Sequence, residues 1–297
     1  MRGGLAQFVL VIPAWLLCQM PQLHAQETSS TRSASDCQSP RTSHAERVHP
    51  QVSVAEVNFI GDLHLPIEDR DEVVSSIKQL HQVNDIVDEA LERVRYGWEN
   101  HGYFKVHVQG EAKILSANSR GRLVALDVRV DEGQQYRLSG ISFQRNHAIS
   151  DVATLRSFFP INDGEVLSRE KIATGVENLR KAYAHLGYRN FTAVPGTGFD
   201  DVNQSIYLVI DLDEGKRFHI GSVNVWGLDE ASATRILNAI PTPAGGVYDS
   251  QLYEAFLMRY ASMMPECTCE RALNAIVTDA RTGMVTINLD FRPCSDN

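Results

Sequence analysis

Apolar residues recur along the chain with two different periods. In three segments they are spaced at i, i+4, i+7 and i+11, which places them on one face of an α-helix: residues 87–98, 172–183 and 253–264. In three others they alternate with polar residues, as in a strand with one face on a core: residues 124–130, 206–212 and 285–291. The pattern predicts amphipathic helices and half-buried strands that follow one another three times.

The same elements return at a nearly constant distance, which indicates an internal repeat. An offset of 81 residues superimposes Gly140 on Gly221 and Pro160 on Pro241, and an offset of 85 carries the first long helix onto the second. Each repeat opens with a strand whose apolar residues are separated by three positions and then by two, which predicts a β-bulge. Gly140 and Gly221 lie inside this gap in the second and third copies.

A shorter helix is expected between the opening strand and the long helix, around residues 70–80, 150–158 and 230–239. The repeat therefore predicts an α+β fold of three tandem β-α-α-β-β modules, each a three-stranded sheet with two helices on one face. We expect these modules at residues 51–133, 134–216 and 217–297.

Two short motifs recur in the first two modules. A glycine follows each long helix, where it can take the left-handed conformation that closes a helix, and a tyrosine comes next: Gly102-Tyr103 and Gly187-Tyr188. An Asp-Glu-Gly turn ends each module, at residues 131–133 and 213–215. These six glycine and tyrosine positions, with Gly140 and Gly221, are candidate structural residues: Gly102, Tyr103, Gly187, Tyr188, Gly140 and Gly221.

This order of elements, with Gly-Tyr before a strand and Asp-Glu-Gly between modules, resembles the polypeptide-transport-associated (POTRA) domain repeats of the BamA and TamA outer-membrane assembly family. The resemblance covers about residues 52–294. It implies a non-enzymatic periplasmic scaffold, chaperone-like, that handles unfolded outer-membrane polypeptides by β-augmentation and contacts accessory lipoproteins. In that family the arm precedes a transmembrane barrel, whereas residue 297 follows the third module directly. A detached arm of a separately encoded outer-membrane barrel is the alternative.

In the same family the second strand of each module is a sheet edge. The corresponding segments here are about residues 104–113, 190–195 and 270–278. In the third module the resemblance assigns a peptide-binding edge strand to alternate residues of the last segment: Arg271, Leu273, Ala275 and Val277.

The N-terminus has the features of a secretory signal peptide at residues 1–25. Arg2 supplies a positive charge, and the apolar run over 8–18 is shorter than the roughly 20 residues that cross a bilayer. Ala25 offers a cleavage point, and the polar residues 26–50 read as a flexible linker. We therefore expect a periplasmic protein, peripheral to the outer membrane.

Charge and motifs narrow the function classes. The chain has 28 Lys and Arg against 37 Asp and Glu, a net charge of −9, and no basic run, which disfavours nucleic-acid binding. Gly196-Thr197-Gly198 lacks the lysine and helix of a phosphate loop, and His101 and His107 have no partner at metal-ligand spacing. The sequence predicts no catalytic residues, no metal and no cofactor. A secreted enzyme on an unfamiliar fold is the weakest alternative.

The cysteines are the one covalent signal. The chain after the signal peptide holds Cys37, Cys267, Cys269 and Cys294, in a compartment that permits disulfides. Three thiols without a fourth ligand disfavour zinc. A hairpin turn centred on Arg281 pairs residues whose numbers add up to about 562, so Cys294 faces position 268. The predicted disulfide joins Cys294 to Cys269 or, with a one-residue shift, to Cys267.

Overall fold

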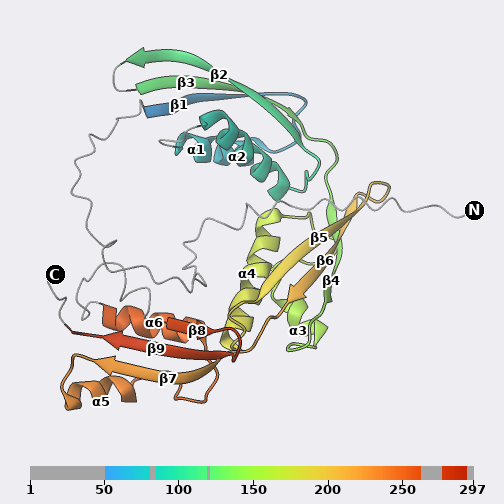
Figure 1. Cartoon of the computed structure of the whole chain (residues 1–297). Helices are drawn as coiled ribbons and strands as arrows, with labels where there is room; N and C mark the ends of the chain where they lie inside the picture. Colours follow the sequence, from blue (N-terminus) through green and yellow to red (C-terminus); the bar gives the residue numbers. More distant parts are fainter. Residues whose placement is uncertain (1–50, 81–84, 119–120, 262–275, 293–297) are drawn as a thin grey trace, which may run out of the picture.

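The computed structural model describes residues 51–80, 85–118, 121–261 and 276–292, and these form three sheets with their helices (Figure 1). The predicted signal peptide, the linker and all five cysteines lie outside the described residues. We use module 1, module 2 and module 3 for residues 51–133, 134–216 and 217–297. No helix in the described ranges is long and apolar enough to cross a membrane.

Each sheet has three strands in the same order, with the third strand of the module in the centre. The orders are β1-β3-β2, β4-β6-β5 and β7-β9-β8. The first strand pairs parallel with the central strand and the second pairs antiparallel. The bounds of the strands are β1 Gln51–Ile60, β2 His107–Asn118, β3 Gly121–Asp131, β4 Arg137–Gln144, β5 Thr192–Asp200, β6 Ser205–Asp213, β7 His219–Trp226, β8 Ile276–Asp279 and β9 Met284–Asp290.

Two helices per module pack on one face of its sheet, as the pattern predicts. Alternate residues of the central strands are buried against them, for example Leu126, Leu208 and Ile287, and each module has its own apolar core. The bounds of the helices are α1 Ile67–Lys78, α2 Ile86–Asn100, α3 Val152–Ser157, α4 Arg169–His185, α5 Glu230–Asn238 and α6 Ser250–Ala261. The fold class predicted from the sequence is thereby confirmed.

The opening strands carry the predicted bulges. Their register shifts between Val54 and Glu56 in β1, between Leu138 and Gly140 in β4, and between Ile220 and Ser222 in β7. The skipped residue is therefore Ser139 in module 2 and Gly221 in module 3. The superposition of Gly140 on Gly221 is wrong by one position, because the opening strands are offset by 82 residues while the helices that follow are offset by 81.

The modules follow one another along a curve, with α2, α4 and α6 on its inner side (Figure 1). The end of α2 contacts the start of α4, and α4 in turn contacts α6. We call the contacts between modules 1 and 2 joint 1, and those between modules 2 and 3 joint 2.

Candidate polypeptide-binding edges and the joints that orient them

The second strand of each module lies at a sheet edge, as the resemblance implies. In module 1 this strand is β2, which has twelve residues and, among the described residues, pairs only with β3. All of its residues from Glu111 to Asn118 are exposed. An edge strand of this length presents a row of unpaired N–H and C=O groups that can accept a further strand.

The corresponding edge in module 2 is interrupted. β5 contains Pro195, Gly196 and Gly198, and it pairs with β6 from Thr192 to Asp200 without a shift in register. Because proline has no N–H and the ladder is unbroken, the nitrogen of Pro195 lies on the side away from β6. The free edge of β5 thus lacks a donor at its centre, where a second strand would need one.

In module 3 the structure describes only part of the predicted edge strand. Val277 lies in β8 opposite Thr286, on the sheet face that carries no helix, and is 44% exposed. Arg271, Leu273 and Ala275 lie outside the described residues, so the assignment of this strand to peptide binding stays a prediction.

The hairpin of module 3 differs from the predicted register by one residue. The numbers of its paired residues add up to 563, as for Val277 and Thr286, and not to 562. The turn is therefore centred half a residue later than Arg281. Cys267, Cys269 and Cys294 lie outside the described residues, so the disulfide is untested.

The Gly102-Tyr103 pair both closes a helix and joins two modules. Gly102 has φ +88°, and the N–H of Tyr103 donates to the carbonyl of Trp98 at 3.1 Å, as expected for a left-handed helix end. The carbonyl of Gly102 then accepts from the N–H of Tyr136, the first ordered contact with module 2, at 2.8 Å. A Cβ on Gly102 would lie 2.7 Å from the carbonyl oxygen of Tyr136. Glycine is therefore required here for conformation and for space.

The same arrangement recurs at joint 2. Gly187 has φ +92°, and the N–H of Tyr188 donates to the carbonyl of Tyr183 at 2.9 Å. The carbonyl of Gly187 accepts from the N–H of Phe218 at 2.9 Å, and a Cβ on Gly187 would lie 2.6 Å from Cγ1 of Val247. Gly-Tyr is thus the backbone element of both joints, a role that the sequence reasoning assigned only to helix termination.

The Asp-Glu-Gly turn supplies a structural carboxylate that the sequence reasoning missed. In module 1 the carboxylate of Glu132 is almost fully buried and accepts from the N–H groups of His64 at 2.7 Å and Leu65 at 3.1 Å and from the indole of Trp98 at 2.8 Å. Burial acts to raise the pKa of Glu132, but these donors together hold that pKa below its ordinary value. Glu132 therefore ties the loop after β1 to α2.

Glu214 does the same in module 2. One carboxylate oxygen accepts from the N–H groups of His147 at 2.7 Å and Ala148 at 2.8 Å and from the hydroxyl of Tyr183 at 3.0 Å. Burial, and then the hydrogen bond to Glu214, raise the pKa of Tyr183. The signal that could have revealed this role is the recurrence of an aromatic side chain, Trp98 and Tyr183, at one place in the repeat.

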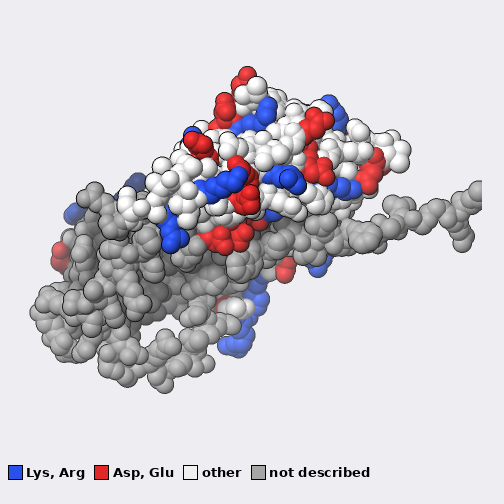
Figure 2. All heavy atoms as spheres, turned by 90° about the horizontal axis from the view of Figure 1, so that it is seen from above, with Lys and Arg blue, Asp and Glu red and all other residues white. Residues whose placement is uncertain are grey.

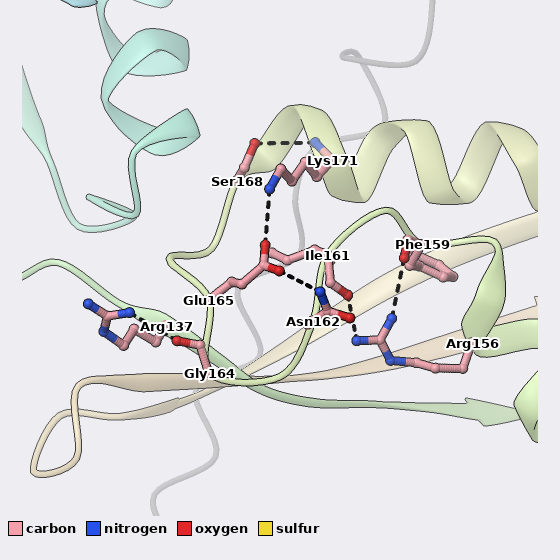
Figure 3. A network of polar contacts seen from close by, with 9 residues as sticks. All are labelled: Arg137, Arg156, Phe159, Ile161, Asn162, Gly164, Glu165, Ser168 and Lys171. Atoms are coloured by element: carbon pink, nitrogen blue, oxygen red, sulfur yellow. Dashed lines mark hydrogen bonds and ion pairs between the residues drawn. The ribbon is translucent and has the colours of Figure 1, made fainter.

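The loop between α3 and α4 fixes where α4 begins. Its residues Gly164 and Glu165 pair with β4 through Leu138, by N–H to carbonyl hydrogen bonds of 2.7 and 2.9 Å. Figure 3 shows the side chain of Glu165 between two donors, the amide of Asn162 at 2.6 Å and the ammonium of Lys171 at 3.0 Å. These contacts hold the first turn of α4 against the sheet of module 2, next to joint 1.

Ion pairs and hydrogen bonds from side chains reinforce joint 1. Arg169 of α4 pairs with Glu99 of α2 at 2.5 Å, and both side chains are largely buried. On the other side of the joint, Asp201 accepts from Lys105 and from the hydroxyl of Tyr136, each at 2.6 Å. The hairpin of β5 and β6 is thereby bound to the start of β2 of module 1.

Joint 2 uses fewer side-chain contacts in the described residues. His185 of α4 lies 2.6 Å from the carboxylate of Asp249 before α6. Lys216 donates to the carbonyl of Arg281 at 2.6 Å, and Arg217 donates to the carbonyl of Leu186 at 2.9 Å. The two joints share their backbone contacts and differ in their side chains.

Joint 1 encloses a cavity of about 510 Å³, lined by residues of both modules, including His64, Asp69, His101, Gln135 and Lys171. Its basic groups face carboxylates: His101 lies 3.2 Å from Asp69, and Lys171 pairs with Glu165. Among the described residues, no group of three or more His, Cys, Asp or Glu side chains could hold a metal ion.

Comparison with known proteins agrees with this architecture. Residues 136–215 match the POTRA family model, described as the surface antigen variable number repeat. Over 173 residues the chain is 24% identical to a putative outer membrane protein assembly factor of Treponema pallidum, and over 169 residues it is 25% identical to the outer membrane protein assembly factor BamA of Neisseria meningitidis. These matches cover 56% and 52% of this chain, and the chain spans about a fifth of the length of each relative.

The solved structure of POTRA domains 3–5 of BamA from Haemophilus influenzae superimposes with a TM-score of 0.55 at 17% identity. The match covers 82% of this chain and 96% of that structure, so it spans three consecutive modules in both. Residues 136–215 of this chain are therefore a POTRA domain, and they stand in an array of three modules with the POTRA fold.

Proposed function

We propose that the chain is a non-enzymatic periplasmic scaffold that binds extended segments of outer-membrane polypeptides by adding them as a fourth strand to a sheet. The observation that carries this proposal is the free edge of β2, twelve residues long, exposed and without proline. Main-chain hydrogen bonds along such an edge give affinity without requiring one client sequence, which suits a protein that handles many unfolded chains.

The relatives support the biological setting of this proposal. Both named relatives are outer membrane protein assembly factors. Joints 1 and 2 would present the edges of successive modules at fixed angles to one long client. A structural subunit of an outer-membrane assembly is the second candidate, and co-purification with a large outer-membrane partner would favour it.

Two neighbouring proline substitutions test binding at β2. Successive residues of an edge strand point their N–H groups alternately toward the sheet and away from it, so one of Glu111→Pro and Ala112→Pro removes a bond to β3 and the other removes an outward donor. Circular dichroism identifies the variant that keeps the native fold.

The folded variant should lose most of its affinity for a labelled peptide from an outer-membrane strand, measured by fluorescence anisotropy. Glu56→Pro, in β1 at the opposite edge of the same sheet, is the matched control if it also stays folded. Unchanged peptide affinity in the folded β2 variant would contradict the proposal.

A further inference from the structure

The outer face of β2, opposite the helices, carries two opposite charges two residues apart. Glu111 lies directly across from Asp127 of β3, which places two carboxylates side by side, and Lys113 forms an ion pair with Asp127. Figure 2 shows acidic and basic side chains interspersed over this side of module 1. Like charges directly opposite each other destabilise a sheet, so a further cation next to Glu111 would stabilise this edge.

The helix face of the same strand has a complementary apolar arrangement. Ile114 lies across from Val124 and is 61% exposed, because the end of the β2–β3 hairpin extends past α1 and α2 (Figure 1). Gly110 has no side chain, and a Cβ there would lie 2.9 Å from Cδ2 of Leu91 in α2. Leu91 thus lies directly over Gly110.

We propose that β2 pairs antiparallel with β2 of a second copy of this chain, about a twofold axis at Ala112. In this register the numbers of paired residues add up to 224. Glu111 of each copy then faces Lys113 of the other, and Gly110 of each copy faces Ile114 of the other. The twofold symmetry makes each of these contacts twice. The result is a six-stranded sheet in which both free β2 edges are closed.

The same register keeps the helices of the two copies apart. Because Leu91 lies over Gly110, α2 covers the part of β2 that precedes Ala112. In an antiparallel pair, α2 of one copy therefore lies beside the residues after Ala112 of the other copy, which that copy's own helices leave uncovered. Ile114 of each copy packs against Leu91 of the other, and this burial of exposed apolar surface stabilises the dimer.

This dimer uses the backbone edge that the proposed function assigns to a client, so the two are mutually exclusive at β2. The dimer itself needs no client. It can therefore be tested in the absence of any peptide, and its failure would leave the proposed function standing.

Charge exchange tests the register. In the E111K variant a lysine faces Lys113 of the second copy, and in the K113E variant a glutamate faces Glu111. Each variant alone should dissociate about tenfold or more readily than wild type, measured for the full chain by sedimentation velocity with a reducing agent present. A mixture of the two variants places lysine opposite glutamate in both pairs, and it should recover a heterodimer of wild-type stability.

The E56K variant, at the opposite edge of the same sheet, makes the same charge change and should self-associate like wild type. Recovery in the mixture also shows that both variants are folded. A wild-type chain that stays monomeric at the highest soluble concentration would overturn the proposal. So would single variants that dimerise like wild type, or a mixture that does not recover.

Discussion

Modules 1 and 2 keep the same residues where a module holds itself together and differ in the strand that each leaves open. Both have a bulged opening strand, a buried or half-buried glutamate that accepts three hydrogen bonds, and a Gly-Tyr pair that joins the next module. At the free edge, β2 has twelve residues without proline, whereas β5 has nine with Pro195 and two glycines.

This difference separates residues that maintain the fold from residues that select a function. The repeated positions face a core or a neighbouring module, so their chemistry is fixed by packing. The edge strands face solvent, and a single proline is enough to remove a donor from one of them. The comparison thus assigns polypeptide capture to module 1 and leaves module 2 as the rigid link between two joints.

The largest expected effect is at the buried glutamate. Glu132→Ala leaves three buried donors without an acceptor, and we expect a loss of about 3 kcal/mol in the stability of module 1. Glu214→Ala, in a more exposed site, should cost module 2 about 1–2 kcal/mol. Hydrogen exchange on the full chain, read separately from β3 and β6 amides, measures both losses. Equal losses in the two modules would break the comparison.

A change of pH sharpens the same contrast. The folded-state pKa of Glu132 is held below its ordinary value, so the stability that it contributes is complete above the unfolded value near 4.5 and is lost as the pH falls through the folded pKa. Wild type and Glu132→Gln should therefore differ in the exchange of module 1 amides at neutral pH and converge in acid. A difference that persists at low pH would show that Glu132 acts by packing alone.

The next effect is at joint 1. Gly102→Ala places a side chain at φ +88°, 2.7 Å from the carbonyl oxygen of Tyr136, so we expect a loss of about 1–2 kcal/mol and a changed angle between modules 1 and 2. Gly133→Ala is the matched control, because φ is +65° there but the nearest atom would be 3.6 Å away. Small-angle scattering should change for the first variant and not for the second.

The smallest effect concerns the side chains that distinguish the joints. Asp201→Asn weakens the contacts with Lys105 and Tyr136 at the exposed side of joint 1, and we expect a loss below about 1 kcal/mol. Interdomain distances measured by spin labels on modules 1 and 2 should broaden. A distribution as narrow as in wild type would mean that Gly102 and the Arg169–Glu99 pair fix the joint by themselves.

The sequence predicted the repeated architecture because periodicity carries it directly. Alternation in the central strands, the three-then-two spacing at the bulges and the glycine after each long helix all have a local physical cause, and all were found. The superposition of Gly140 on Gly221 failed because one residue is gained between the opening strand and the following helix, a change that apolar spacing does not register.

The joints could not be predicted, because they depend on residues distant in sequence. Nothing local to Asp201 indicates that it binds Lys105, and Glu132 looks like an ordinary turn residue until the loop at His64 is folded over it. The free edges were implied by the resemblance, but the interruption of β5 depends on which way Pro195 points, and only the register with β6 gives that direction.

The disulfide stays a prediction. Continuing the observed sum of 563 along the module 3 hairpin would place Cys294 opposite position 269, which favours Cys269 over Cys267. Non-reducing peptide mapping of the exported protein should find this pair. A free Cys294 thiol would contradict it.

The central claim, that β2 and not β5 captures an extended polypeptide, is tested most directly by hydrogen exchange with and without a bound peptide. The full chain is held below the concentration at which it self-associates, and a peptide from an outer-membrane strand is added in excess. The account predicts slower exchange of outward-facing β2 amides between His107 and Ile114, with β5 unchanged. Protection of β5 amides, or peptide binding that leaves β2 exchange unaltered, would contradict it.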